Sequence, residues 1–244
     1  MKMSITTRLF VGLVAAGSVF VSVQALLQRQ AIDVTRFLVI LAFVLVASRF
    51  KVTLPKLNGS MSVTLPFILV ALMQMSFLEA LIVTCGSALM QSLGSGQKKP
   101  KPIQVLFNIS NLANAIGLAY LAIHQQPVTS GLPASALVVA VAATVYFLAN
   151  TIPVSAIIAM TEGKNMFSIW REVFLWSFPY YVTSAGLAAM IASLHRYISW
   201  ETMLLLPVAY ALFVSYKTYF SAPRKQPSSV FTQPHAKMQS ASGD

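Results

Sequence analysis

The chain has 244 residues, of which 57% are hydrophobic and only 9% are charged, whereas a soluble domain averages about 25% charged residues. The charged residues gather between apolar runs long enough to cross about 30 Å of hydrocarbon. This excludes a soluble domain and predicts an all-α, polytopic membrane bundle. A β-barrel is excluded because it would need alternating segments of about ten residues, which the sequence lacks.

The first apolar run extends from Leu9 to Leu27 and follows Lys2 and Arg8. A cleaved signal peptide would also have this form, with residues 23–25 as a passable cleavage site. We favour a retained membrane span, because the run is long and a second run follows at once.

The second predicted span covers about Ile32–Ser48, and Asp33 can pair with Arg36 near its start. Residues 50–64 then break the helical pattern, since apolar and polar residues alternate on both sides of Asn58-Gly59. This dipeptide is a strong hairpin signal. We therefore expect a small β-hairpin on the cytosolic membrane surface.

Leu65–Leu93 is too long for one straight span and short for two. Its predicted turn lies at Met75–Glu79, so the third and fourth segments are either two short helices or a re-entrant pair. Glu79 is the only acid in this stretch. At depth in the membrane it would be a functional candidate, whereas at an outer turn it would simply be solvated.

The second half of the chain brings the total to about eight hydrophobic segments. Kinks are expected at Pro153 and Pro179, because proline cannot donate a backbone hydrogen bond. Residues 1–220 form the predicted transmembrane helical domain, and 221–244 a disordered cytoplasmic tail. The remaining segments are a basic loop at 94–102, spans at 104–123, 135–160, 173–194 and 202–220, and a short amphipathic helix within 162–172.

The formal net charge is +11, which in a soluble protein would suggest nucleic acid. If the segments alternate from a cytoplasmic N-terminus, all but Arg29, Arg36 and Arg196 of the 17 Lys and Arg residues lie in the cytoplasm. The six acids split evenly. This bias predicts a multi-pass protein of the bacterial inner membrane, with both termini cytoplasmic, the lipid bilayer as partner and no nucleic acid.

Three asparagines, Asn108, Asn111 and Asn114, occur three residues apart in the predicted span 104–123. At 100° per residue they cover an arc of roughly 120°. Amides cannot be left bare in hydrocarbon, so this face must meet another helix or a polar cavity. Asn150 is the natural partner. Two interpretations remain open, namely interhelical hydrogen bonds and a ligand pocket lined by amides.

Tyr180 and Tyr181 belong to an aromatic group that forms either a membrane-interface belt or a pocket wall. Ala113 and Gly117 form a small-xxx-small pair that would let a neighbouring helix approach closely. Enzyme signatures are missing: there is no HExxH, no CxxC, no paired in-membrane acids and no phosphate-binding loop. The lone Cys85 excludes an intramolecular disulfide and a cysteine-built metal site. We therefore expect no enzyme, no cofactor and no metal.

Several short motifs resemble landmarks of a bacterial membrane module. That module is the N-terminal, multi-helix, sensor-type region found fused to HD-GYP or GGDEF cyclic-di-GMP signalling domains. The resemblance covers about residues 35–220. It implies that Phe107, Asn108 and Asn150 are structural or sensing landmarks. The motifs are Arg49–Pro55, Ser60–Leu65, Leu106–Asn108, Tyr146–Thr151, Trp170–Glu172 and Pro179–Tyr181.

The chain departs from that pattern because it ends about 24 residues after the last predicted span, so we expect no output domain. The leading hypothesis is a sensor-like membrane module that binds an apolar or amphipathic ligand, or a partner helix, within the bundle. It would signal through a cytoplasmic partner protein, and homo-oligomers are left open. The alternative is a small-solute permease or the substrate-binding subunit of a transporter. Candidate ligand-binding residues are Asn108, Asn111, Asn114, Asn150, Tyr180, Tyr181 and Glu79.

Overall fold

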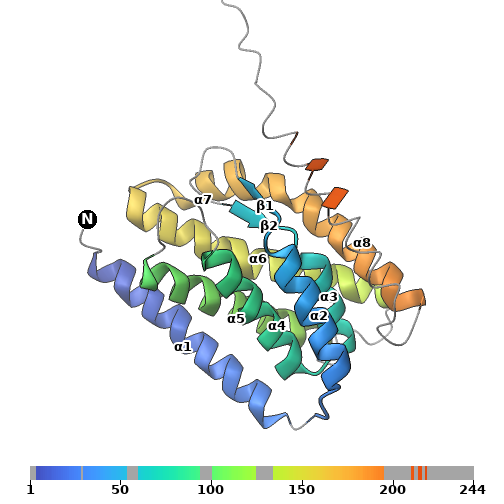
Figure 1. The fold of residues 1–244 in the computed structure, drawn as a ribbon. Coiled ribbons are helices and arrows are strands. Elements are labelled where there is room, and N and C mark those ends of the chain that lie inside the picture. Colours follow the sequence, from blue (N-terminus) through green and yellow to red (C-terminus); the bar gives the residue numbers. More distant parts are fainter. Residues whose placement is uncertain are drawn as a thin grey trace, which may run out of the picture.

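The computed structural model describes residues 4–28, 30–53, 60–93, 101–124 and 134–194, together with residues 210, 211, 214, 215 and 218. Most of this part is helical (Figure 1). A π-helical turn, Trp170–Phe174, and a 3₁₀ turn, Leu175–Ser177, join the last two helices. The helices are α1 Ile5–Leu27, α2 Val34–Ala47, α3 Leu65–Gln74, α4 Phe77–Leu93, α5 Pro102–His124, α6 Ala134–Glu162, α7 Met166–Ile169 and α8 Phe178–Leu194; the strands are β1 Lys51–Thr53 and β2 Ser60–Ser62.

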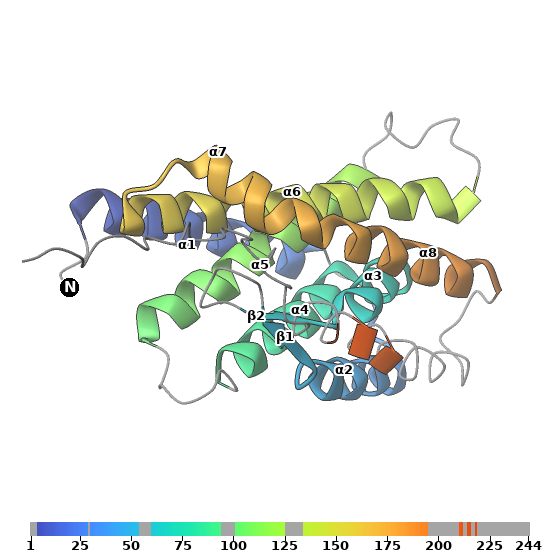
Figure 2. The same ribbon diagram turned by 90° about the horizontal axis from the view of Figure 1, so that it is seen from above.

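Helix α5 lies at the centre of the bundle and packs against α1, α4 and α6. Helix α6 also packs against α8, and α3 lies between α8 and α4. Figure 2 shows α6 and α8 along one side of the molecule and α2 along the opposite side. This arrangement supports the predicted all-α bundle and places the asparagine-bearing helix in its middle.

Within the described residues, three helices are long and apolar enough to cross a membrane: α1, α5 and residues Leu137–Glu162 of α6. Helices α2, α3 and α4 are apolar but shorter. The predicted spans 202–220 and the tail 221–244 lie outside the described residues, apart from five isolated positions. The total of eight hydrophobic segments therefore stays a prediction.

The segment predicted to turn at Met75–Glu79 consists of two helices, α3 and α4, separated only by Met75 and Ser76. Ser76 is the N-cap residue that precedes α4. Its backbone N–H and its hydroxyl both donate to Glu79 Oε2, at 2.9 and 2.6 Å, and the Glu79 N–H donates back to the Ser76 hydroxyl at 3.3 Å. This reciprocal pattern is a capping box, which satisfies the free N–H groups of a helix start.

Every side chain of α3 from Leu65 to Leu72 is buried, as expected of a helix that is apolar on all sides. The chain before α3 forms a two-stranded antiparallel pair in which Lys51 lies opposite Ser62 and Thr53 opposite Ser60. Both strands fall within the predicted hairpin segment. The residues that would form its turn, 54–59, lie outside the described residues.

The sequence predicted a kink at Pro179 inside a helix spanning 173–194. This prediction is wrong, because the regular helix begins only at Phe178. Helix α8 begins at Phe178, so Pro179 lies in the first turn, where a missing N–H costs little. The preceding carbonyl of Leu175 accepts a bond from the Phe178 N–H instead. The irregularity therefore precedes the helix, as a π turn and a 3₁₀ turn. Pro153 lies inside α6, which stays helical through it.

Candidate functional site

The three asparagines of α5 contact three different helices instead of one common neighbour. Asn108 Nδ2 is 3.4 Å from Ser92 Oγ of α4, and the Asn108 side chain is exposed. Asn111 faces α6, and Asn114 faces α1. Because α5 is central, an arc of about 120° on its surface is wide enough to reach several neighbours. The interpretation of these amides as interhelical hydrogen bonds therefore fits the structure.

Asn111, which is buried, and Asn150, which is partly buried, form a polar link between α5 and α6. Asn111 Nδ2 donates to Asn150 Oδ1 at 2.9 Å and to the Asn150 backbone carbonyl at 3.0 Å. Asn150 Nδ2 in turn donates to the Tyr181 hydroxyl at 3.1 Å. This chain of bonds, which we call the amide relay, joins α5, α6 and α8. Within the described residues, the Asn111 Oδ1 atom is buried without a partner, so the relay retains an unused acceptor.

Asn114 ties α5 to α1 by a bond to the backbone. Its Nδ2 donates to the Val14 carbonyl at 2.8 Å. Gly17, one turn further on, makes this approach possible, since a Cβ at this position would lie 3.1 Å from Asn114 Oδ1. A side chain on Gly17 would therefore displace the amide.

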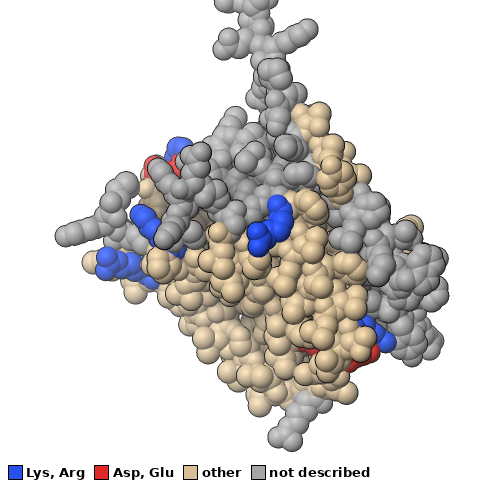
Figure 3. Space-filling view, viewed as in Figure 1, with Lys and Arg blue, Asp and Glu red and all other residues tan. Residues whose placement is uncertain are grey.

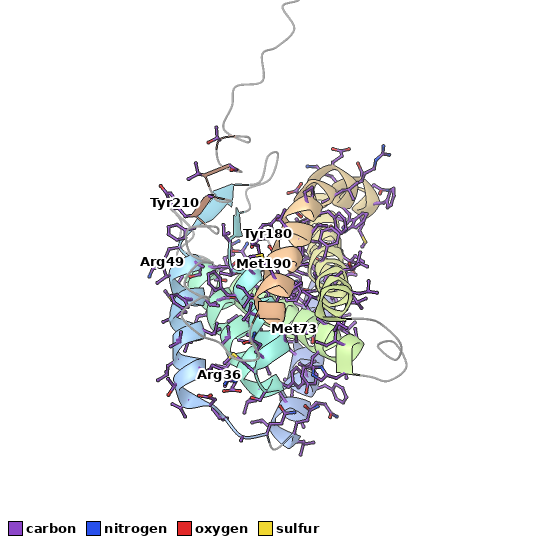
Figure 4. All side chains as sticks on the ribbon, turned by 90° about the vertical axis from the view of Figure 1, so that its right-hand side faces the viewer. Arg36, Arg49, Met73, Tyr180, Met190 and Tyr210 are labelled. Atoms are coloured by element: carbon purple, nitrogen blue, oxygen red, sulfur yellow. The ribbon has the colours of Figure 1, made fainter. Side chains whose placement is uncertain are left out.

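Tyr180 and Tyr181 are adjacent in the chain, but their hydroxyl groups bind different helices, α3 and α6. The Tyr180 hydroxyl accepts a bond of 3.0 Å from the N–H of Leu65, the first residue of α3. Figure 4 shows Tyr180 and Met190 on α8 with Met73 of α3 on the same face, and Arg36 and Arg49 on the α2 side. Tyr181 points to α6 instead. Of the two, only Tyr181 lines the groove described next.

An apolar groove of about 260 Å³ lies between α6 and α8. Its floor is formed by small residues, and Gly186 would accept a Cβ without any atom within 4 Å. Tyr181 is 5% exposed and connects this groove to the amide relay. The lining residues are Ala140, Ala143 and Thr144 of α6, with Phe178, Tyr181, Val182, Ala185, Gly186 and Ala189 of α8.

An aromatic cluster connects the groove with the turn before α8. The ring of Phe147 lies 4.8 Å from that of Tyr181, 5.3 Å from Phe178 and 6.0 Å from Trp170. Trp170 begins the π-helical turn, and its Nε1 donates to Thr151 Oγ1 at 3.0 Å. The Phe147 ring therefore links Tyr181 and Phe178 to Trp170.

Glu79 is remote from the groove, in the first turn of α4. It lies at the predicted turn and yet is 3% exposed. The expectation of a solvated carboxylate is therefore wrong, because the neighbouring helices cover this turn. No group of three or more His, Cys, Asp or Glu side chains able to hold a metal occurs in the described ranges.

Sequence reasoning included Phe147 only within the motif Tyr146–Thr151, without a role at the site, and it missed the small residues of α6. A signal for the latter was present: Ala140, Ala143 and Thr144 follow the spacing of one helix face. Phe147 carries no such signal, because one more phenylalanine in an apolar helix is unremarkable without its neighbours.

The family comparison agrees with this architecture. A family model, MASE9, matches residues 18–220. The chain belongs to the MASE9 family. MASE domains are membrane-associated sensor modules of signalling proteins, so this MASE9 chain is a membrane protein of the sensor class. No curated protein and no solved structure matches it.

Proposed function

We propose that this MASE9 chain is a multi-pass sensor of the bacterial inner membrane that binds a single-chain amphipathic molecule, of the fatty-acid type, in the groove between α6 and α8. It acts by binding and not by catalysis, and passes its state to a cytoplasmic signalling partner. HD-GYP or GGDEF proteins are the partners that the sequence resemblance suggests.

The observation that carries this proposal is the amide relay. An acyl chain in the groove would contact Tyr181, whose hydroxyl accepts from Asn150, and Asn150 accepts from Asn111 on the central helix. Hydrogen bonds linked in a chain within the low-dielectric interior polarise one another, so a displacement at one end of the relay affects the bonds at the other. Occupancy of the groove would therefore bias the packing of three helices at once.

The apolar lining of the groove favours an acyl chain. Most of the lining residues are alanine, glycine, valine or phenylalanine, and the only polar side chains among the lining residues are those of Thr144 and Tyr181. Binding sites for apolar ligands use such walls with a few convergent polar groups. Helices α6 and α8, which line the groove, lie along one side of the bundle (Figure 2).

The distribution of charge supports the proposed orientation. Helices α1 and α5 begin at the end of the bundle where α6 terminates and α7 lies (Figure 1), so Arg8, Lys101, Lys164 and Arg171 gather at this end. Figure 3 shows basic groups at the left end of this face and near its centre, and an acidic group beside a basic one at the lower right. At the start of α2, Arg36 pairs with Asp33 at 3.3 Å. Cations concentrate on the cytoplasmic side of membrane proteins.

The test is photolabelling of the full-length protein in lipid nanodiscs with a fatty acid that carries a diazirine and an alkyne. Saturable labelling should map to peptides of α6 and α8. Gly186→Leu adds a side chain to the groove lining at a position where a Cβ meets no atom within 4 Å, and it should weaken labelling about tenfold or more, a loss of at least about 1.4 kcal/mol. Gly12→Leu, at an equally open position on α1, is the matched control and should label like wild type.

Tyr181→Phe separates binding from transmission, because it keeps the ring in the groove and removes the relay hydroxyl. Labelling should persist. The ligand-induced change in Trp170 fluorescence should decrease, because the relay reaches Asn150, the neighbour of the Thr151 whose hydroxyl accepts from Trp170 Nε1, whereas the ring contacts through Phe147 remain. The fluorescence is read in a variant with Trp176 and Trp200 replaced by Phe. Labelling spread evenly over the lipid-facing helices, or unaffected by Gly186→Leu, would refute the groove. Solute uptake by vesicles that contain this chain alone would favour the permease.

A further inference from the structure

The junction of α3 and α4 concentrates buried polar atoms that lack partners. Of the five such side-chain atoms found in the described part of the chain, three lie within six residues: Gln74 Nε2, Gln74 Oε1 and Glu79 Oε1. Native interiors rarely leave buried polar groups unpaired, and such groups commonly bind an ion or a water molecule. The junction is therefore the place in this molecule where a bound polar species is most needed.

Two negative features meet at this junction. Helix α3 ends at Gln74, and the last carbonyl groups of a helix have no intrahelical donors and carry its negative dipole end. The N–H of Ser76, which would bond back to α3 if the helix continued, donates to Glu79 Oε2. These bonds hold the Glu79 carboxylate at Ser76, which follows the end of α3 by two residues. The other carboxylate oxygen, Oε1, has no hydrogen-bond donor among the described residues.

The capping box neutralises only part of this charge. The start of α4 and Ser76 satisfy one carboxylate oxygen, whereas the other is buried without a donor. A buried anionic group is costly unless it is paired or coordinates a cation. The same junction offers two other kinds of oxygen atom to a cation: the amide oxygen of Gln74, which is also buried without a partner in the described part of the chain, and the carbonyls at the end of α3.

We propose that the α3–α4 junction binds a monovalent metal cation of the sodium type, through Glu79 Oε1, Gln74 Oε1 and the carboxyl end of α3. Oxygen atoms are the ligands that hard cations prefer. Interrupted membrane helices hold sodium in this manner, with carbonyls at the broken end and a carboxylate beside them. A water bound to the ion would accept from Gln74 Nε2.

A monovalent ion fits better than a divalent one because the site holds a single carboxylate. A divalent ion would leave a buried positive charge uncompensated. Clusters of three or more His, Cys, Asp or Glu, the sets typical of transition metals, are absent from the described ranges. The site is independent of the groove proposed above, and it lies at the bundle end opposite α7 (Figure 1). In the orientation proposed above, this end faces outward.

The test measures thermal unfolding of the purified full-length protein in nanodiscs, with sodium chloride replaced stepwise by choline chloride at constant ionic strength. A ligand that binds the folded state alone raises stability with its concentration. Sodium should raise the unfolding temperature in a saturable way, and ²²Na⁺ should bind with a stoichiometry of one per chain.

Glu79→Gln is the decisive variant, because glutamine at this position preserves the capping box and removes the charge. It should fold and lose both the sodium-dependent shift and ²²Na⁺ binding, and Gln74→Leu should weaken both. Glu162→Gln, an exposed acid paired with Lys164 at the other end, should behave as wild type. A wild type indifferent to sodium, a shift retained in Glu79→Gln, or stabilisation by Mg²⁺ or by low pH alone would overturn the assignment.

Discussion

At Gly117, α5 lies against α1 without room for a side chain. A Cβ at this position would lie 2.8 Å from both methyl carbons of Val21. A β-branched side chain in a helix has one strongly preferred rotamer, so Val21 cannot turn away. The small-xxx-small pair read from the sequence therefore serves the packing of α1, the N-terminal helix.

Gly117→Ala should lower the thermal stability of the detergent-solubilised protein. The gain in helix propensity is about 1 kcal/mol, and overpacking costs about 1–3 kcal/mol, so the clash should outweigh the gain. Val21→Ala in the same chain should restore stability by making room. Gly12→Ala, on the open face of α1, is the control and should not destabilise. A Gly117→Ala protein as stable as wild type would mean that α1 does not approach α5 this closely.

Asn111 and Asn108 have the same chemistry and unequal surroundings. Asn111 is 1% exposed and makes two short bonds to α6, whereas Asn108 is exposed and makes one bond of 3.4 Å. Asn111→Ala should destabilise the folded protein by about 0.6–1.7 kcal/mol, the range measured for interhelical hydrogen bonds in membranes. Asn108→Ala should cost clearly less. Thermal unfolding of both variants decides the ranking, and equal losses would contradict the central role of the relay.

At the scale of the helical elements, Pro179 determines where regular helix can begin. It cannot donate to the carbonyl of Leu175, which accepts from Phe178 instead. The π turn that starts at Trp170 lies directly before this exchange. Such turns are frequent at functional sites, and this one carries the tryptophan that contacts Phe147.

Pro179→Ala should make the segment 170–178 more regular, because alanine supplies the missing donor to Leu175. Hydrogen–deuterium exchange followed by mass spectrometry should show slower exchange of these amides, which report local opening. Pro153→Ala, a proline-to-alanine change inside α6, controls for a general effect of removing proline. Unchanged exchange in Pro179→Ala would show that packing and not the proline causes the irregular turns.

At the scale of the whole molecule, the helix directions and the charges agree. Helices α1 and α5 start, and α6 ends, at one end of the bundle (Figure 1), and the basic residues Arg8, Lys101 and Lys164 flank these three termini. Green fluorescent protein fused after Glu162 should therefore fluoresce, because it folds only in the cytoplasm, and a fusion after Thr129 should stay dark. The reverse pattern would invert the proposed topology and the side from which sodium arrives.

The sequence by itself determined the class and the organisation of the bundle. Segregated charge and long apolar runs predicted a helical membrane protein. Leu65–Leu93 is too long for one span, which predicted a turn at Met75–Glu79, and α3 and α4 are separated there. The asparagines of α5 also required polar partners, and the sequence predicted Asn150 as one of these partners. These features follow from local chemistry, since hydrocarbon tolerates neither charge nor unpaired backbone groups.

Only the tertiary structure decided how the polar residues are shared among neighbours. It separated Asn108 from Asn111, directed Tyr180 to α3 and Tyr181 to α6, and buried Glu79 beside the end of α3. Periodicity gives the direction of a side chain relative to its own helix. Which helix lies in that direction, and how closely, depends on packing between segments far apart in the sequence. A groove or an unpaired carboxylate oxygen exists only once those segments meet.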